Sequence, residues 1–342
     1  MKHLKTIFFL IVCLTVGVGI GKAYLWWRNP RRGFEKHIEP PLITGIGDAP
    51  GNRGFTVRAG DLASLPAVIK QAQECFGTGI GLEYSPALTK DALINAAKAV
   101  HGAKMSVTLL PPAVFNVQNP YPRGLGEIAA DAQAAGLDYV CISWLNAVPD
   151  EAYWSGQIQA VREAYHGQII LAGTDNVLPM VPFFSTIDVI GAIGPLHLAR
   201  RLPNAPDDIN VHDMRVMWDC SLTSLSSLAK VHDKKLALLH MNVPLEVWFK
   251  LPVAGTIEQP PKPNYGLQEL LYEALLLETK GRAEWTDMML FDWGTTAAQK
   301  DAPNHVPGLM AKITEAWDPK KPKQAETTPA TPDAGDADTA AN

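Results

Sequence analysis

Between residues 42 and 317, short β-rich runs alternate with helical stretches, and this alternation constrains the fold more than any other feature. Such alternation is typical of parallel strands joined by helices. Eight βα units close into a ring. The sequence therefore predicts an α/β protein with a (β/α)8 TIM barrel over residues 42–317. The expected strands are residues 42–47 or 54–59, 78–84, 104–110, 138–144, 168–172, 188–193, 235–241 and 287–292.

Eight helices are expected around this barrel. Leu62, Leu65 and Ile69 lie at helical spacing in the first of them. Thr89 is a candidate N-cap for the second, and Gly167 stands where a later helix should stop. The first helix is expected at residues 61–76, and later ones at residues 125–135, 153–165, 217–231, 267–280 and 307–317.

Composition supports one large core and excludes one class of partner. The chain has 342 residues, of which 47% are hydrophobic and 19% charged. Its formal net charge is -5, and acidic and basic residues are mixed, so no extended basic surface is expected and nucleic acid is excluded as a partner. Cys75, Cys141 and Cys220 lack metal-ligand spacing, and we expect neither a metal nor another cofactor.

The first 27 residues form a membrane-targeting element. Lys2 and Lys5 precede an uncharged run over residues 6–21, and Lys22, Tyr24 and Trp26 follow it. Lysine and aromatic side chains suit the membrane interface, so residues 6–27 are expected to act as a signal anchor. The alternative is a cleaved signal peptide with a site at residues 21–23.

The regions that flank the barrel are expected to be a linker and a tail. Residues 28–41 connect the anchor to the barrel, which we expect on the periplasmic or extracellular side. Arg28, Arg31 and Arg32 favour the cytoplasmic side instead, so the orientation stays open. Residues 318–342 carry no large apolar side chain and predict a disordered tail.

A more specific resemblance lies in the second half of the chain. Residues 135–145, AGLDYVCISWL, resemble the fourth strand of glycoside hydrolase family 113, the endo-β-mannanase-like TIM barrels. Residues 183–196, FFSTIDVIGAIGPL, and 290–293, LFDW, are similar to later segments of that family. A chitinase-like barrel is a competing template for the first segment. Both templates imply a TIM barrel that acts on polysaccharide or oligosaccharide.

The resemblance also implies two catalytic glutamates, which this chain lacks. A retaining glycosidase needs two carboxyl groups about 5 Å apart, one as acid and one as nucleophile. The positions that match them hold Leu145 and Met241. A shift of one residue in the seventh strand offers His240 or Asn242, and neither is a carboxylate. The barrel is therefore expected to be noncatalytic.

Other side chains at expected strand ends are candidates to bind a sugar or to replace the lost acids. The resemblance makes Trp293 the counterpart of an aromatic platform under the bound sugar. Candidate ligand-binding residues are Trp293, Trp144, Asn146, His240, Asn242, Glu83, Tyr84 and Asp175. Fallback carboxylates for hydrolysis are Glu246, Asp175, Glu83 and Asp292.

Two functions of different class follow from these expectations. The first is a membrane-anchored, noncatalytic barrel that binds a glycan or serves as an accessory or scaffold subunit with a protein partner in a membrane complex. The alternative is an active mannanase-like glycoside hydrolase that uses carboxylates from outside the family's two positions.

Overall fold

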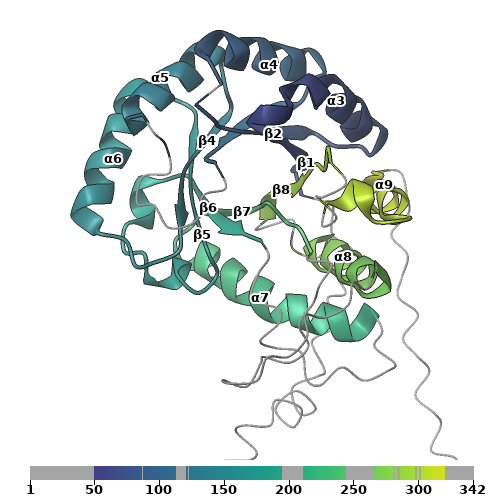
Figure 1. Ribbon diagram of the computed structural model, residues 1–342. Coiled ribbons are helices and arrows are strands. Elements are labelled where there is room, and N and C mark those ends of the chain that lie inside the picture. Colours follow the sequence, from purple (N-terminus) through teal and green to yellow (C-terminus); the bar gives the residue numbers. More distant parts are fainter. Residues whose placement is uncertain are drawn as a thin grey trace, which may run out of the picture.

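The computed structural model contains a closed barrel of eight parallel strands, as the alternation predicted (Figure 1). The structure describes residues 50–319 except 87, 113–120, 122, 195–210, 244–264, 281, 283–285, 297–298 and 300–301. The strands are β1 (Asn52–Val57), β2 (Gly79–Glu83), β3 (Ser106–Leu110), β4 (Tyr139–Leu145), β5 (Gln168–Gly173), β6 (Val189–Ile193), β7 (Lys235–Leu239) and β8 (Thr286–Asp292).

Each strand pairs with the next along the chain, and β8 returns to pair with β1. Gly54 of β1 lies opposite Gly79 of β2 and Leu290 of β8. An alanine at Gly54 would place its Cβ 1.8 Å from the carbonyl oxygen of Gly79. Glycine is therefore required where these two backbones approach each other.

Side chains alternate between the barrel interior and its outer face. The interior holds an inner cluster that includes Leu110, Cys141, Ile170, Leu239 and Leu290. A larger outer cluster fills the layer between strands and helices. This alternation is the packing expected of a small barrel whose interior is filled by side chains.

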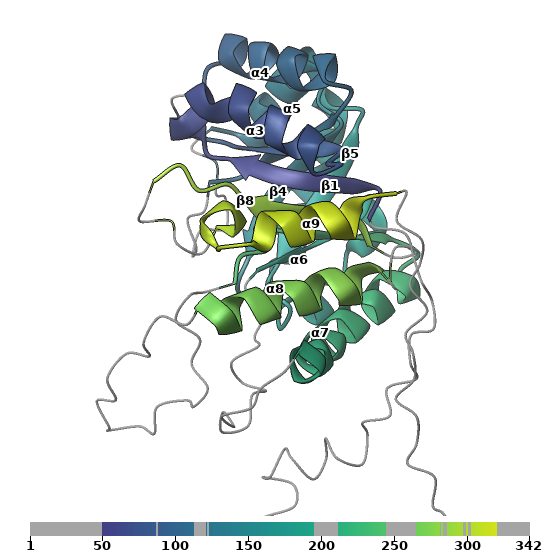
Figure 2. The same cartoon turned by 90° about the vertical axis from the view of Figure 1, so that its right-hand side faces the viewer.

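Helices surround the strands, and neighbouring helices pack on one another from α3 to α6 and from α7 to α9 (Figure 1, Figure 2). Their bounds are α3 (Leu65–Glu74), α4 (Lys90–Gly102), α5 (Leu125–Ala135), α6 (Glu151–Ala164), α7 (Val211–Val231), α8 (Tyr265–Lys280) and α9 (Leu309–Trp317). The short 3-10 turns are η1 (Ala59–Ser64), η2 (Leu178–Met180), η3 (Phe184–Thr186) and η5 (Pro303–His305). Thr89 caps α4 by accepting a hydrogen bond from the backbone N–H of Ala92.

The expectation of eight helices is wrong for one unit. Residues 174–188, all described, connect β5 to β6 through η2 and η3 without an α-helix. Pro179 and Pro182 lie in this stretch and disfavour a continuous helix. Leu178 and Phe184 are buried there, so the two turns cover the outer face of the barrel as a helix would.

The first strand lies at Asn52–Val57, which agrees with the prediction of residues 54–59. The other candidate, residues 42–47, lies outside the described residues. So do the membrane segment 1–27, the linker 28–41 and all of the tail except residues 318 and 319. Within the part of the chain that is described, no helix has the length and apolar character needed to cross a membrane.

A network of polar side chains closes the N-terminal end of the barrel. Asn52 donates hydrogen bonds to the Tyr139 hydroxyl at 2.9 Å and to Asp287 at 3.3 Å, and it accepts one from Ser106 at 2.9 Å. Burial, and then the nearby Asp287 carboxylate, raise the pKa of Tyr139 to about 12. Barrels of this kind carry their active sites at the opposite, C-terminal end. We therefore assign this network to the stability of the barrel.

Two glycine-to-alanine substitutions, one in the barrel and one in a surrounding helix, should change the free energy of unfolding in opposite directions. A Cβ at Gly81 would meet the Thr56 hydroxyl at 2.7 Å and Leu110 at 3.0 Å, whereas one at Gly156 in α6 has no atom within 4 Å. We expect Gly81→Ala to lower the free energy of unfolding by about 1–3 kcal/mol. Gly156→Ala should raise it by up to about 1 kcal/mol, because alanine favours the helix. Urea denaturation of both variants measures this, and equal effects would contradict the packing described.

Candidate functional site

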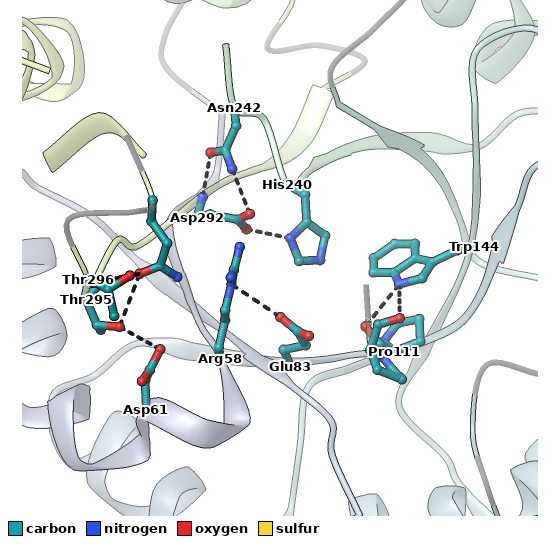
Figure 3. A network of polar contacts seen from close by, with 12 residues as sticks. Arg58, Asp61, Glu83, Pro111, Trp144, His240, Asn242, Asp292, Thr295 and Thr296 are labelled. Atoms are coloured by element: carbon teal, nitrogen blue, oxygen red, sulfur yellow. Dashed lines mark hydrogen bonds and ion pairs between the residues drawn. The ribbon is translucent and has the colours of Figure 1, made fainter. Parts of the chain in front are cut away.

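Charged and polar side chains gather at the C-terminal ends of four adjacent strands (Figure 3). Arg58 follows β1, Glu83 ends β2, His240 and Asn242 follow β7, and Asp292 ends β8. Because β7, β8, β1 and β2 are neighbours in the ring, their ends meet on one side of the barrel mouth. We call these five residues the mouth cluster.

Asp292 is at the centre of the mouth cluster. His240 Nδ1 lies 2.5 Å from Asp292 Oδ1, and Asn242 donates through Nδ2 to Asp292 Oδ2 at 2.7 Å. The Asn242 side-chain oxygen accepts from the backbone N–H of Asp292 at 3.2 Å. Both carboxylate oxygens are thus engaged, and the position of the imidazole is fixed relative to the strand end.

The electrostatics of this pair favour an ion pair. Burial alone lowers the pKa of His240, but the facing Asp292 carboxylate outweighs it, and the net pKa is raised above 6.5. Burial alone raises the pKa of Asp292, but the His240 charge and hydrogen bond outweigh it, and the net pKa is lowered below 3.8. The two shifts therefore favour a charged imidazole facing a charged carboxylate.

Among the residues that the structure describes, none forms a hydrogen bond with the second ring nitrogen of His240. Nε2 is buried, and the whole residue is 7% exposed. The Trp144 ring stands edge-on to the imidazole with the ring centres 4.9 Å apart. Trp144 in turn donates its N–H to the backbone oxygens of Pro111 and Pro112, at 3.0 and 2.9 Å. The imidazole is thus held on two sides, by Asp292 and by Trp144.

A bulge in β4 decides which of its residues faces the barrel interior. Cys141 lies opposite Ile170 of β5, whereas Trp144 lies opposite Ala172, so β4 has one residue more than its partner. The Ser143 hydroxyl donates to the Ala172 carbonyl and accepts from the Ala172 N–H. A bulge reverses the faces of the residues after it. Trp144 therefore joins the inner cluster, and Leu145 lies in the outer cluster.

The side chains after β7 also change the face towards which they point. Strict alternation from Ala237 and Leu239 would turn Met241 inward, but His240 has a φ of 51° and breaks the alternation. His240 then faces the mouth, and Met241 joins the outer cluster. Gly194, after β6, permits this turn, because a Cβ there would lie 2.8 Å from the His240 carbonyl oxygen. Leu145 and Met241, which sequence alternation turns inward, thus both lie outside the lumen.

Arg58 is the member of the mouth cluster that sequence reasoning missed. Its Nε lies 4.0 Å from Glu83 Oε2, with the Arg58 side chain 44% exposed and the Glu83 side chain 14% exposed. Arg58 also contributes to the lowered pKa of Asp292. The signal available in the sequence was its place directly after the first strand, at the end where such barrels carry their sites.

The remaining predicted residues lie apart from the mouth cluster or are not described. Trp293 packs edge-on against Phe55 at 5.3 Å in the layer outside the strands, rather than as a platform in the lumen. Tyr84 is buried edge-on against Tyr121 at 5.2 Å. Asn146 is exposed and Asp175 is partly buried, and Glu246 lies outside the described residues. Among described side chains, no group of three His, Cys, Asp or Glu is placed to hold a metal.

The fold defines a TIM barrel, and solved structures of glycoside hydrolases share it. The GH113 β-mannanase of Alicyclobacillus acidocaldarius, solved in complex with ManMIm, has a TM-score of 0.55 at 18% identity, over 80% of this chain and 98% of that one. Two structures of GH113 β-1,4-mannanase, one of them a complex, each have a TM-score of 0.57. Their identities are 13% and 15%, over 79% and 78% of this chain and 99% of theirs.

No protein-family model and no curated protein matches the sequence. The solved structures therefore confirm the predicted resemblance at the level of the barrel fold. Because a shared fold does not imply a shared function, the chemistry of the site depends on the residues of this chain.

The ion pair predicts a pH-dependent loss of stability in Asp292→Asn. We expect a loss of about 2 kcal/mol, the value of a buried hydrogen bond to a charged group. The contribution of His240 is complete below its unfolded pKa of about 6.5 and is lost as the pH rises through its raised folded pKa. That of Asp292 is complete above its unfolded pKa of about 3.8 and is lost as the pH falls through its lowered folded pKa.

The stability difference between native protein and Asp292→Asn is therefore largest between about pH 4 and 6.5. Urea denaturation at a series of pH values measures it. A difference that does not change with pH would show that the pair does not ionise as described.

Proposed function

We propose that this protein is a noncatalytic, glycoside hydrolase-like barrel that binds an oligosaccharide at its mouth. The observation that carries the proposal is the contact between Trp144 and His240 at the ends of β4 and β7. These are the two strands on which the resemblance places the catalytic glutamates. An indole and an imidazole face the mouth there, and neither supplies a carboxyl group.

The carboxylates of the mouth cluster are poorly arranged to replace that pair. Asp292 accepts hydrogen bonds on both oxygens, and its lowered pKa opposes the protonated form that a general acid requires. Glu83 stands on β2 beside Arg58, with β1 between it and Asp292. This arrangement supports binding over hydrolysis.

Several features support a saccharide as the ligand. The mouth cluster offers donors and acceptors at the end of the barrel where such folds place their ligands. The mannanase from Alicyclobacillus acidocaldarius has the same fold and was solved in complex with ManMIm. An oligosaccharide of the mannan type is therefore the first ligand to test.

The proposal predicts binding without turnover. The purified protein is incubated with oligosaccharides of mannan, chitin and glucan, with binding followed by calorimetry and hydrolysis by release of reducing ends. We expect heat of binding with at least one series and no release of reducing ends. Tyr139→Phe, at the opposite end of the barrel, is the matched control and should bind as the native protein does.

Turnover that disappears in Glu83→Gln or Asp292→Asn would contradict the noncatalytic proposal and favour the mannanase-like alternative. Neither binding nor turnover would favour the accessory or scaffold role in a membrane complex.

We also propose that residues 6–27 anchor the barrel to a membrane, with the barrel on the periplasmic or extracellular side. The uncharged run and its interfacial Tyr and Trp residues support this proposal. The full chain should sediment with membranes, and a chain that lacks residues 1–27 should not. A protease added outside an intact cytoplasmic membrane should digest the barrel. Protection from that protease would contradict the orientation, and a soluble full chain would contradict the anchor.

A further inference from the structure

We propose that His240 contacts the sugar, through a hydrogen bond between its Nε2 and a hydroxyl group of the bound saccharide. This inference rests on the proposed function and assigns a specific contact to it. The resemblance places a glutamate at the end of the seventh strand, where His240 turns towards the mouth, and a histidine there implies a contact that the family's glutamate does not make.

The first observation is the unpartnered Nε2 itself. A buried polar atom without a hydrogen bond is uncommon in a folded protein and costs free energy. Nε2 of His240 is such an atom, whereas Nδ1 of the same ring is bound to Asp292. The ring is fixed by Asp292 and Trp144, so it cannot turn Nε2 towards another partner without losing these contacts.

The second observation is the state of the ring. The bond from Nδ1 to Asp292 requires a proton on Nδ1, so Nε2 carries a lone pair in the neutral ring and a proton in the charged ring. The Asp292 carboxylate raises the pKa of His240 and so favours the charged ring, in which Nε2 donates. A hydroxyl group satisfies Nε2 in either state, because it both accepts and donates.

The charge balance of the mouth cluster favours an uncharged acceptor. When His240 is charged, it and Arg58 carry one positive charge each, Glu83 and Asp292 carry one negative charge each, and the cluster is formally neutral. Glu83 contributes to the electrostatic environment of His240, which places a carboxylate close to the imidazole. An anionic ligand would meet that carboxylate. A hydroxyl accepts from Nε2 and donates to a carboxylate, which has room for several donors.

Figure 3 shows how these residues lie. His240 lies between Asp292 and Trp144, Asn242 lies above Asp292, and Arg58 and Glu83 lie below Asp292 and His240. Asp292 and Asn242 do not contact the ligand in this proposal. They are positioning residues that hold the imidazole through its other nitrogen.

The experiment compares β-1,4-mannotriose with analogues that each lack one hydroxyl group. Calorimetry is performed on the full chain in a detergent without a sugar headgroup, for the native protein and for His240→Phe, which keeps a ring beside Trp144. A hydrogen bond to a charged group corresponds to roughly a tenfold change in affinity or more. We expect one analogue to bind the native protein about tenfold more weakly than mannotriose does.

His240→Phe should bind mannotriose about tenfold more weakly than the native protein and should not distinguish that analogue from mannotriose. Loss of the distinction is the signature of a direct contact, because a purely structural defect weakens all analogues alike. Tyr139→Phe is the matched control and should keep the native pattern. Native affinity in His240→Phe, or an unchanged preference among the analogues, would overturn the inference while leaving the proposed function intact.

A second measurement uses only the native protein and needs no variant. In native protein labelled with ¹⁵N-histidine, the Nε2 resonance of His240 should shift when mannotriose is added. Bound mannotriose with an unchanged Nε2 resonance would overturn the inference. Failure of the native protein to bind any of the mannan, chitin and glucan oligosaccharides would instead remove the proposed function, and the inference with it.

Discussion

The pairing of β8 with β1 is the constraint on which the mouth of this barrel depends. Asp292 and Glu83 are far apart in the sequence, yet they end strands that flank β1 on either side. Arg58, at the end of β1, then lies between two carboxylates. Ring closure also places β7 beside β8, so that His240 meets Asp292. An open sheet with the same strands would separate β8 from β1 and remove Arg58 from Asp292.

Two local irregularities of the backbone determine which side chains face this mouth. The β4 bulge turns Trp144 inward, and its cost to the sheet is reduced by the Ser143 hydroxyl, which bonds to both backbone groups of Ala172. The positive φ of His240 is uncommon for a residue with a side chain, although histidine is enriched there. Bulges and unusual dihedrals are frequent near functional sites in proteins.

The resulting site combines a fixed imidazole with a balance of charges. A glycosidase requires carboxyl groups with different protonation states on opposite sides of one bond. Here both oxygens of the best-placed carboxylate, Asp292, are hydrogen-bonded to His240 and Asn242. The same contacts hold the His240 ring with its Nε2 available to a hydroxyl group. Features that oppose hydrolysis therefore support recognition of a hydroxyl-rich ligand.

Periodicity and turn residues are local signals, and from them the sequence located seven of the eight strands, left two candidates for the first, and placed Glu83, His240, Asn242 and Asp292 at strand ends. It did not determine which side chains share the lumen. Alternation turned position 145 inward, and a single extra residue in β4 reversed it, since side chains repeat every two residues. The place of Arg58 directly after the first strand is a local signal, but only ring closure brings it to Asp292, because that contact joins segments far apart in the sequence.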